Sequence, residues 1–279
     1  MKTKVRRTAV KTILYIILTV FAFIWIYPFI WMITASFKTQ DEFWGSGLKI
    51  FPENPTFENF IRSWNNANFS QYFLNTIIVT VCAVIIVLLC TSAAGYALGR
   101  YKFPGKKVLL GVFMASITIP LTFTIIPIYE LLNGMHLTNN LLGLIIAECG
   151  GSHILFLMLF SSFYSGLPKE MEEAAIVDGC GFFQTYWKIM FPLSKPIIVT
   201  VVIMQFIWTW NSFLLPLVLT LSKPNLRTLA VGLYALKGEH VVDWTGIAAG
   251  ATIAVLPIII VFICLQKYFV NGIAGAVKS

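Results

Sequence analysis

The side chains that could do chemistry in this sequence form two groups, one inside apolar stretches and one in a polar stretch. The first group consists of Glu148, His153, Gln205, Trp208, Trp210 and Asn211. Buried amides and indoles need hydrogen-bond partners, and a sugar offers hydroxyl groups to an amide and a C–H face to a tryptophan ring. We interpret this group as candidates for the path of a sugar-like solute, lined by Asn211 and one of the two tryptophans.

The same residues also fit simpler roles. Tryptophans and amides occur in aromatic belts at membrane interfaces and in hydrogen bonds between helices. Glu148 and His153 are five residues apart, so on one continuous helix they would project about 140° apart and form no direct pair. Ionisable groups at membrane depth are functional candidates, so this pair would carry protons, line a water-filled cavity or contact a neighbouring subunit.

The second group lies in the polar stretch 167–181, which contains four of the twelve acidic residues. Each charge would cost several kcal/mol in hydrocarbon, so this stretch must face water. Pro168 and three glutamates suit the first turn of a helix, and Gly179 suits its end. A second helix is predicted from about Phe182 to a point before Pro192.

One face of the first of these helices is predicted to contact another surface. Met171, Ala174, Ala175 and Asp178 share that face at helical spacing. The two alanines leave room for close approach, so we interpret the stretch as a docking element.

Composition places the whole chain in a membrane. It is 58% hydrophobic and only 11% charged, whereas about 25% charged residues is usual for soluble domains. The net charge of +8 does not indicate nucleic acid, because the basic residues gather beside apolar stretches. Five cysteines without paired spacing predict small buried side chains and no disulfide framework.

No catalytic set, metal-ligand pattern or nucleotide-binding loop is recognisable. The three histidines are scattered, and the nearest match to a phosphate-binding loop, Gly99 to Lys107, has the wrong spacing and lacks Ser or Thr. We therefore expect that this chain is not an enzyme and binds no cofactor.

Six apolar stretches are long enough to cross a bilayer. They are predicted at 12–37, 72–98, 108–132, 141–164, 196–221 and 246–269. Gly95 and Gly99 have the spacing that allows close helix approach, and Pro120 and Pro127 predict a broken third span. The run from Phe57 to Trp64 is amphipathic and predicts a segment at the membrane interface.

The distribution of basic residues predicts the orientation. If successive loops alternate sides, 14 of the 20 Lys and Arg residues lie on the side of both termini. The positive-inside rule places that side, together with the docking stretch at 165–195, in the cytoplasm.

The docking stretch resembles a signature of permease subunits of binding-protein-dependent ABC importers. That signature is Glu-Ala-Ala, three residues, Gly, nine residues, Ile, any residue and Leu-Pro. Its counterparts here are Glu173, Ala174, Ala175, Gly179, Ile189 and Pro192, with Phe191 in place of the leucine.

Other stretches are similar to the carbohydrate-uptake branch of these permeases, the maltose-permease-G type. They are Ala93 to Arg100, Trp208 to Phe213 and the tail from Gln266 to Lys278. Relatives often have an acidic residue where this chain has Ser212.

This resemblance implies a single all-α permease domain over residues 1–279, with the type I ABC importer permease fold. Six transmembrane helices would carry a cytoplasmic coupling helix between spans 4 and 5. The residues implied to couple to a separate ATPase subunit are Glu173, Ala174, Ala175, Asp178, Gly179, Ile189 and Pro192.

The implied assembly lies in the bacterial cytoplasmic (inner) membrane. It contains a second permease subunit, two ATPase subunits that bind ATP and Mg, and an extracytoplasmic solute-binding protein that delivers a carbohydrate. The alternative is a stand-alone proton-coupled secondary transporter that uses Glu148 and His153.

Overall fold

The computed structural model describes residues 2–45, 47, 49–66, 68–150, 153–237 and 242–276, and within them the chain is helical without any strand. This agrees with the all-α fold that the family resemblance implied. Contacts divide the chain into two compact units: unit 1 comprises residues 1–69 and 233–255, and unit 2 comprises residues 70–232 and 256–279.

Long helices cover three of the predicted spans. They are α1 (Lys2–Ala35), α4 (Phe69–Arg100) and α15 (Trp244–Ala276). By length and composition each contains a segment able to cross a membrane. The side chains of α1 from Lys11 to Ile30 are exposed, as expected for a helix whose neighbour is lipid.

The other predicted spans are interrupted. The third consists of α5 (Lys106–Ser116) and α6 (Leu121–Gly134), and the fourth of α7 (Leu141–Cys149) and α8 (Ile154–Gly166). Pro120 is extended before α6, which confirms a break there, whereas Pro127 lies inside α6.

The fifth stretch was predicted as one helix, but α12 (Lys195–Trp210) ends early and α13 (Leu214–Leu219) follows after a turn. Pro216 explains this difference, because a continuous helix would place the proline ring against the carbonyl of Ser212. The Asn211 side chain donates a hydrogen bond of 2.8 Å to the Ile207 carbonyl and occupies the C-cap.

In unit 2, α4 and α8 pack closely through Gly95 and Gly99. A methyl group on Gly95 would collide with Phe160, and one on Gly99 would lie 2.7 Å from the Ser161 carbonyl oxygen. The close approach predicted from the glycine spacing is confirmed. A buried cluster lies beside this contact: Val87, Tyr96, Phe156, Phe160, Tyr164, Tyr186, Met190 and Val201.

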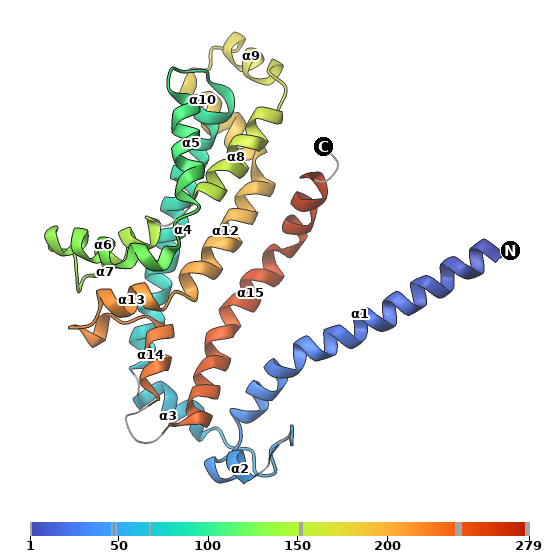
Figure 1. Ribbon diagram of the computed structural model, residues 1–279, viewed down its shortest axis with the longest axis vertical. Coiled ribbons are helices and arrows are strands. Elements are labelled where there is room, and N and C mark those ends of the chain that lie inside the picture. Colours follow the sequence, from blue (N-terminus) through green and yellow to red (C-terminus); the bar gives the residue numbers. More distant parts are fainter. Residues whose placement is uncertain are drawn as a thin grey trace. The chain divides into compact units, whose positions relative to one another are not determined.

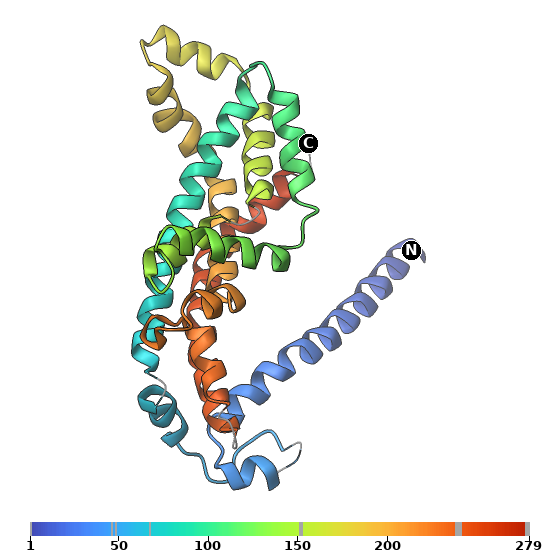
Figure 2. The same ribbon diagram turned by 60° about the vertical axis from the view of Figure 1, so that its left-hand side comes forward.

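Further helices in unit 2 extend this packing. α6 and α7 run crosswise to α4 (Figures 1 and 2), and α13 packs against both. The described residues before α15 include the 3-10 turn η2 (Pro224–Leu226) in unit 2 and α14 (Leu229–Ala235), which begins in unit 2 and ends in unit 1.

In unit 1, α2 (Gln40–Gly45) and α3 (Glu58–Asn66) follow α1. The polar face of α3 is the buried one: Asn59 donates hydrogen bonds to the carbonyls of Ser36 and Lys38, and Ser63 donates to that of Gly246. These bonds attach α3 to the end of α1 and to the first turn of α15.

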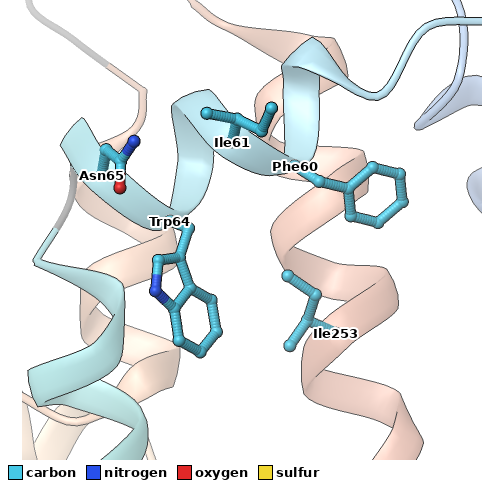
Figure 3. Close-up of a pocket in the computed structure, with 5 residues that line it drawn as sticks. All are labelled: Phe60, Ile61, Trp64, Asn65 and Ile253. Carbon is cyan, nitrogen blue, oxygen red and sulfur yellow. The ribbon is translucent and has the colours of Figure 1, made fainter.

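The apolar face of α3 is correspondingly exposed. Phe60, Ile61 and Trp64 line a shallow groove of about 310 Å³ with Asn65 and with Ile253 of α15 (Figure 3). Polar side chains inward and apolar side chains outward suit a helix resting against lipid, as predicted for the run from Phe57 to Trp64.

Candidate functional site: a polar cavity and a charged loop

Unit 2 contains a cavity of about 490 Å³ that brings together five of the six candidate path residues. Its lining comes from α6, α7, the N-cap of α8, α12, and α13 with the turn before it, which gather around the end of α12 (Figure 1). The polar and aromatic side chains of the lining that matter here are Glu148, His153, Gln205, Trp208, Asn211 and Ser212.

Three buried atoms of this lining have no hydrogen-bond partner: Glu148 Oε1, His153 Nδ1 and Gln205 Oε1. Gln205 is only 1% exposed, and its amide nitrogen donates to Thr209 Oγ1 at 3.0 Å while its oxygen stays free. An unpartnered buried polar atom costs about 1–3 kcal/mol, so three of them in one cavity favour a site that a polar ligand or water completes.

Glu148 and His153 are not on one helix, because α7 ends at Cys149 and α8 begins at Ile154. The prediction that their side chains do not pair holds, but the continuous helix used to derive it was wrong. His153 Nε2 instead lies 3.1 Å from the backbone oxygen of Glu148, and the Glu148 carboxyl bonds to the Ser212 side chain.

An aromatic wall lies beside these polar atoms. The ring of Trp208 stacks on Phe156 at 5.0 Å between centroids, and Phe156 stacks on His153 at 5.7 Å. Trp208 is 43% exposed, so part of its ring remains available. A face of this kind beside unpaired amide and carboxyl oxygens is complementary to a saccharide.

Trp210 is the one candidate outside the cavity. It is 4% exposed and packs against Phe73 and Phe206, with ring centroids 5.7 and 5.2 Å away. This residue belongs to the core of unit 2, so it is neither a path residue nor part of an aromatic belt at the membrane interface.

The candidate coupling residues lie in a loop at one end of unit 2 (Figures 1 and 2). Helix α9 (Glu170–Val177) carries three glutamates in its first turn, where the helix dipole favours negative charge. Asp178 is the C-cap residue that follows it. The next residue, Gly179, has a φ of +79°, the left-handed conformation that glycine adopts most readily. The glutamates and Gly179 thus mark the predicted start and stop, but the placement of Pro168 in the first turn was wrong, because Pro168 precedes the N-cap residue Lys169.

The residues predicted to share one face of α9 differ in their exposure. Ala174 and Asp178 are exposed together with Glu173, whereas Ala175 is 2% exposed and packs inward. Large apolar side chains are exposed nearby, above all Ile176 at 66% and Val177 at 87%. Sequence reasoning missed these two, although an Ile-Val pair in an acidic stretch was a usable signal.

The second helix of the loop continues through Pro192, contrary to the prediction. It consists of α10 (Phe182–Thr185), the π-helical turn η1 (Tyr186–Met190) and α11 (Phe191–Leu193). The change to π-helical bonding leaves Pro192 in the first turn of α11, where no intrahelical partner is needed for its missing N–H. The exposed Pro192 and half-buried Ile189 lie on this segment.

Glu172 faces the membrane helices and not the exposed side of the loop. Its carboxylate accepts bonds of 2.8 Å from Arg100 Nε and from Tyr96 OH, both on α4. Arg100 also donates to the carbonyls of Tyr164 and Leu167. These contacts fix the start of the loop to α4 and α8, and sequence reasoning did not find them.

A buried hydroxyl chain joins the other end of the loop to the same helices. Tyr186 donates to Ser92 at 2.9 Å, Ser92 lies 3.0 Å from the Tyr164 hydroxyl, and Tyr164 donates to Ser194 at 3.1 Å. Both ends of the loop are thus bonded to α4 and α8.

No group of three or more metal-ligating side chains occurs among the described residues, and the five cysteines are free.

Comparison with known proteins gives consistent relatives. YurM of Bacillus subtilis strain 168, a probable ABC transporter permease protein, is 34% identical over 91% of this chain and 84% of its own length. The diacetylchitobiose uptake system permease protein NgcG of Streptomyces coelicolor is 31% identical over 94% of this chain and 86% of its own length.

A solved structure shares the fold. It is a crystal structure of a bacterial ABC transporter involved in the import of the acidic polysaccharide alginate. The match has a TM-score of 0.80 and 23% identity, and it covers 93% of this chain and 96% of that one.

The family model described as "Binding-protein-dependent transport system inner membrane component" matches residues 92–275, which include the cavity and the charged loop. The chain therefore belongs to this family of multi-pass ABC importer permeases.

Proposed function

We propose that this chain is the permease subunit of an ATP-driven importer that moves a carbohydrate through the cavity of unit 2. The observation that carries this proposal is the set of three unpartnered oxygen and nitrogen atoms beside the exposed face of Trp208. The names of similar permeases support the substrate class, since they refer to diacetylchitobiose and to starch degradation products.

In this proposal the loop from Glu170 to Leu193 docks on a separate ATPase subunit. Glu173, Ala174, Asp178 and Gly179 are exposed and available for that contact. The bonds of Glu172 and Tyr186 to α4 would transmit a displacement of the loop to the membrane helices. ATP hydrolysis, with its Mg, takes place in the ATPase chain.

The complete importer contains a second permease, two ATPase subunits and an extracytoplasmic binding protein that delivers the solute. The charge asymmetry of the loops supports an orientation with both termini and the coupling loop in the cytoplasm. The cavity then passes the solute from the binding protein to the cytoplasmic side.

Purification of the tagged chain from its native membrane in mild detergent tests this assembly. We expect a second permease and an ATPase with a phosphate-binding loop to accompany it. A lone chain or a homo-oligomer, reproducibly and after crosslinking, would contradict the proposal.

The energy source separates an importer from a proton-coupled transporter. Collapsing the proton gradient while the ATP concentration is held constant should leave uptake unchanged. Loss of uptake under these conditions would instead favour the proton-coupled alternative through Glu148 and His153.

A further inference from the structure

The described lining of the cavity in unit 2 contains an acidic side chain but no lysine or arginine. Glu148 is the only Asp, Glu, Lys or Arg side chain in the described lining, and its Oε1 has no hydrogen-bond partner. The other polar groups around it are neutral amides and hydroxyls, with His153 as the one further titratable group. A negatively charged solute in this cavity would find a carboxylate and no lysine or arginine partner in the described lining.

A second observation indicates that this lining is built to bind. Gln205 is almost completely buried, and its free Oε1 belongs to the same cavity. Both unpartnered oxygens, on Glu148 and on Gln205, are hydrogen-bond acceptors. Their complement is a ligand rich in donors, such as hydroxyl or ammonium groups.

We propose that the Glu148 carboxylate sets the charge selectivity of the permease, so that the cavity admits neutral and amino-bearing saccharides and rejects anionic ones. This inference rests on the proposed function and narrows its substrate class. Uronates, sulfonated sugars and sugar phosphates are excluded, because like charges at short range repel more strongly inside a protein, where the effective dielectric constant is lower than in water.

This charge selectivity can be measured without any natural solute, from the rates at which charged reagents modify a cysteine introduced into the cavity lining. Ser212→Cys is made in a background whose five cysteines are replaced by alanine, and the purified importer is treated at pH 8 with methanethiosulfonate reagents. One reagent carries a trimethylammonium group and the other a sulfonate. Each rate is divided by the rate of the same reagent with free mercaptoethanol.

We expect the normalised rate of the cationic reagent to exceed that of the anionic reagent by about tenfold or more. Glu148→Gln in the same background should remove the difference, and Glu148→Asp should retain most of it. Asn211→Cys supplies a second position in the same cavity if Ser212→Cys fails to assemble.

Equal rates, a faster anionic reagent, or a ratio unaffected by Glu148→Gln would overturn the inference. A thiol that is unreactive at both positions would also do so, because the cavity would then be closed to water-borne solutes. Whether the proposed importer function itself is wrong is tested separately, by co-purification of the ATPase and by the energy source of uptake.

Discussion

Trp208 and Trp210 are two residues apart on α12 but have different surroundings. Trp208 lines the cavity, whereas Trp210 is buried between Phe73 and Phe206. We expect Trp210→Ala to lower the free energy of unfolding by about 3–5 kcal/mol, the usual cost of a large cavity in a packed core.

Truncation of Trp208 should act on transport instead. We expect Trp208→Ala to reduce ATP-driven uptake at least tenfold with a much smaller change in thermal stability, and Trp208→Phe to restore part of the uptake through its ring face. Thermal denaturation in detergent and uptake in proteoliposomes are measured for all three variants. Equal effects of the two alanine variants on stability would contradict the assignment.

Asp243, in unit 1, accepts hydrogen bonds from Arg62 and from the Gly246 N–H at the start of α15. Burial on its own would raise the pKa of Asp243, but these bonds and the charge of Arg62 outweigh it and hold the pKa below the usual 3.8. A group with a lowered native pKa stabilises the fold above its unfolded pKa, and this stabilisation is lost as the pH falls through the native value.

Asp243→Asn therefore gives a pH-dependent prediction. At pH 7 we expect it to reduce the free energy of unfolding by about 1.5–3 kcal/mol, the range for a hydrogen bond to a charged group. This difference from the unmodified chain should stay constant down to about pH 5 and shrink below about pH 4. Denaturation from pH 8 to pH 3 checks this, with the exposed Asp41→Asn as a control.

At the scale of elements, the turn after α9 depends on the backbone of one glycine. Gly179 has φ +79°, whereas Gly181 has φ −77°, and both have open space around the position of a Cβ atom. A β-branched residue is strained only at the first of these positions. We expect Gly179→Val to weaken co-purification of the ATPase subunit and Gly181→Val to leave it nearly unchanged.

Both glycine variants should still reach the membrane, as quantitative blotting of membrane fractions would show. If the two variants retained the ATPase equally well, the left-handed turn would have no part in docking.

The attachment of α9 to α4 gives a prediction about local motion. The ion pair of Arg100 with Glu172 is 2.7 Å long and mostly buried, so removal of one partner should cost about 3–5 kcal/mol locally. We expect Glu172→Ala to speed hydrogen exchange across α9 and to lower uptake, because the loop is then loosely held. Glu170→Ala, at an exposed position of the same turn, is the matched control. Unchanged exchange in both variants would show that the hydroxyl chain through Tyr186 suffices to hold the loop.

For the whole molecule, local chemistry in the sequence predicted local structure well. Apolar length indicated helices at all six predicted stretches, and the glycine spacing on α4 predicted its close contact with α8. Acidic residues and Gly179 marked the start and end of α9, since dipole and backbone preferences act within a few residues.

Features that depend on distant contacts were not predictable. Arg100 and Glu172 are far apart in sequence, and nothing near either residue identifies the other. Similarly, only the assembled helices show that Trp208 lines a cavity and Trp210 does not. Periodicity gives the faces of a helix but not the element that each face contacts.

The exposed Ile176 and Val177 have a consequence for how the chain survives in a cell. Apolar side chains on a water-facing loop are the feature by which proteases and chaperones recognise an unassembled subunit. In the docking proposed above, a copy bound to its ATPase subunit would cover both side chains, and a copy made in excess would leave them open to such surveillance. The abundance of this permease would then be set by turnover of the surplus, so we expect its level to follow that of the scarcest partner and not the strength of its own synthesis.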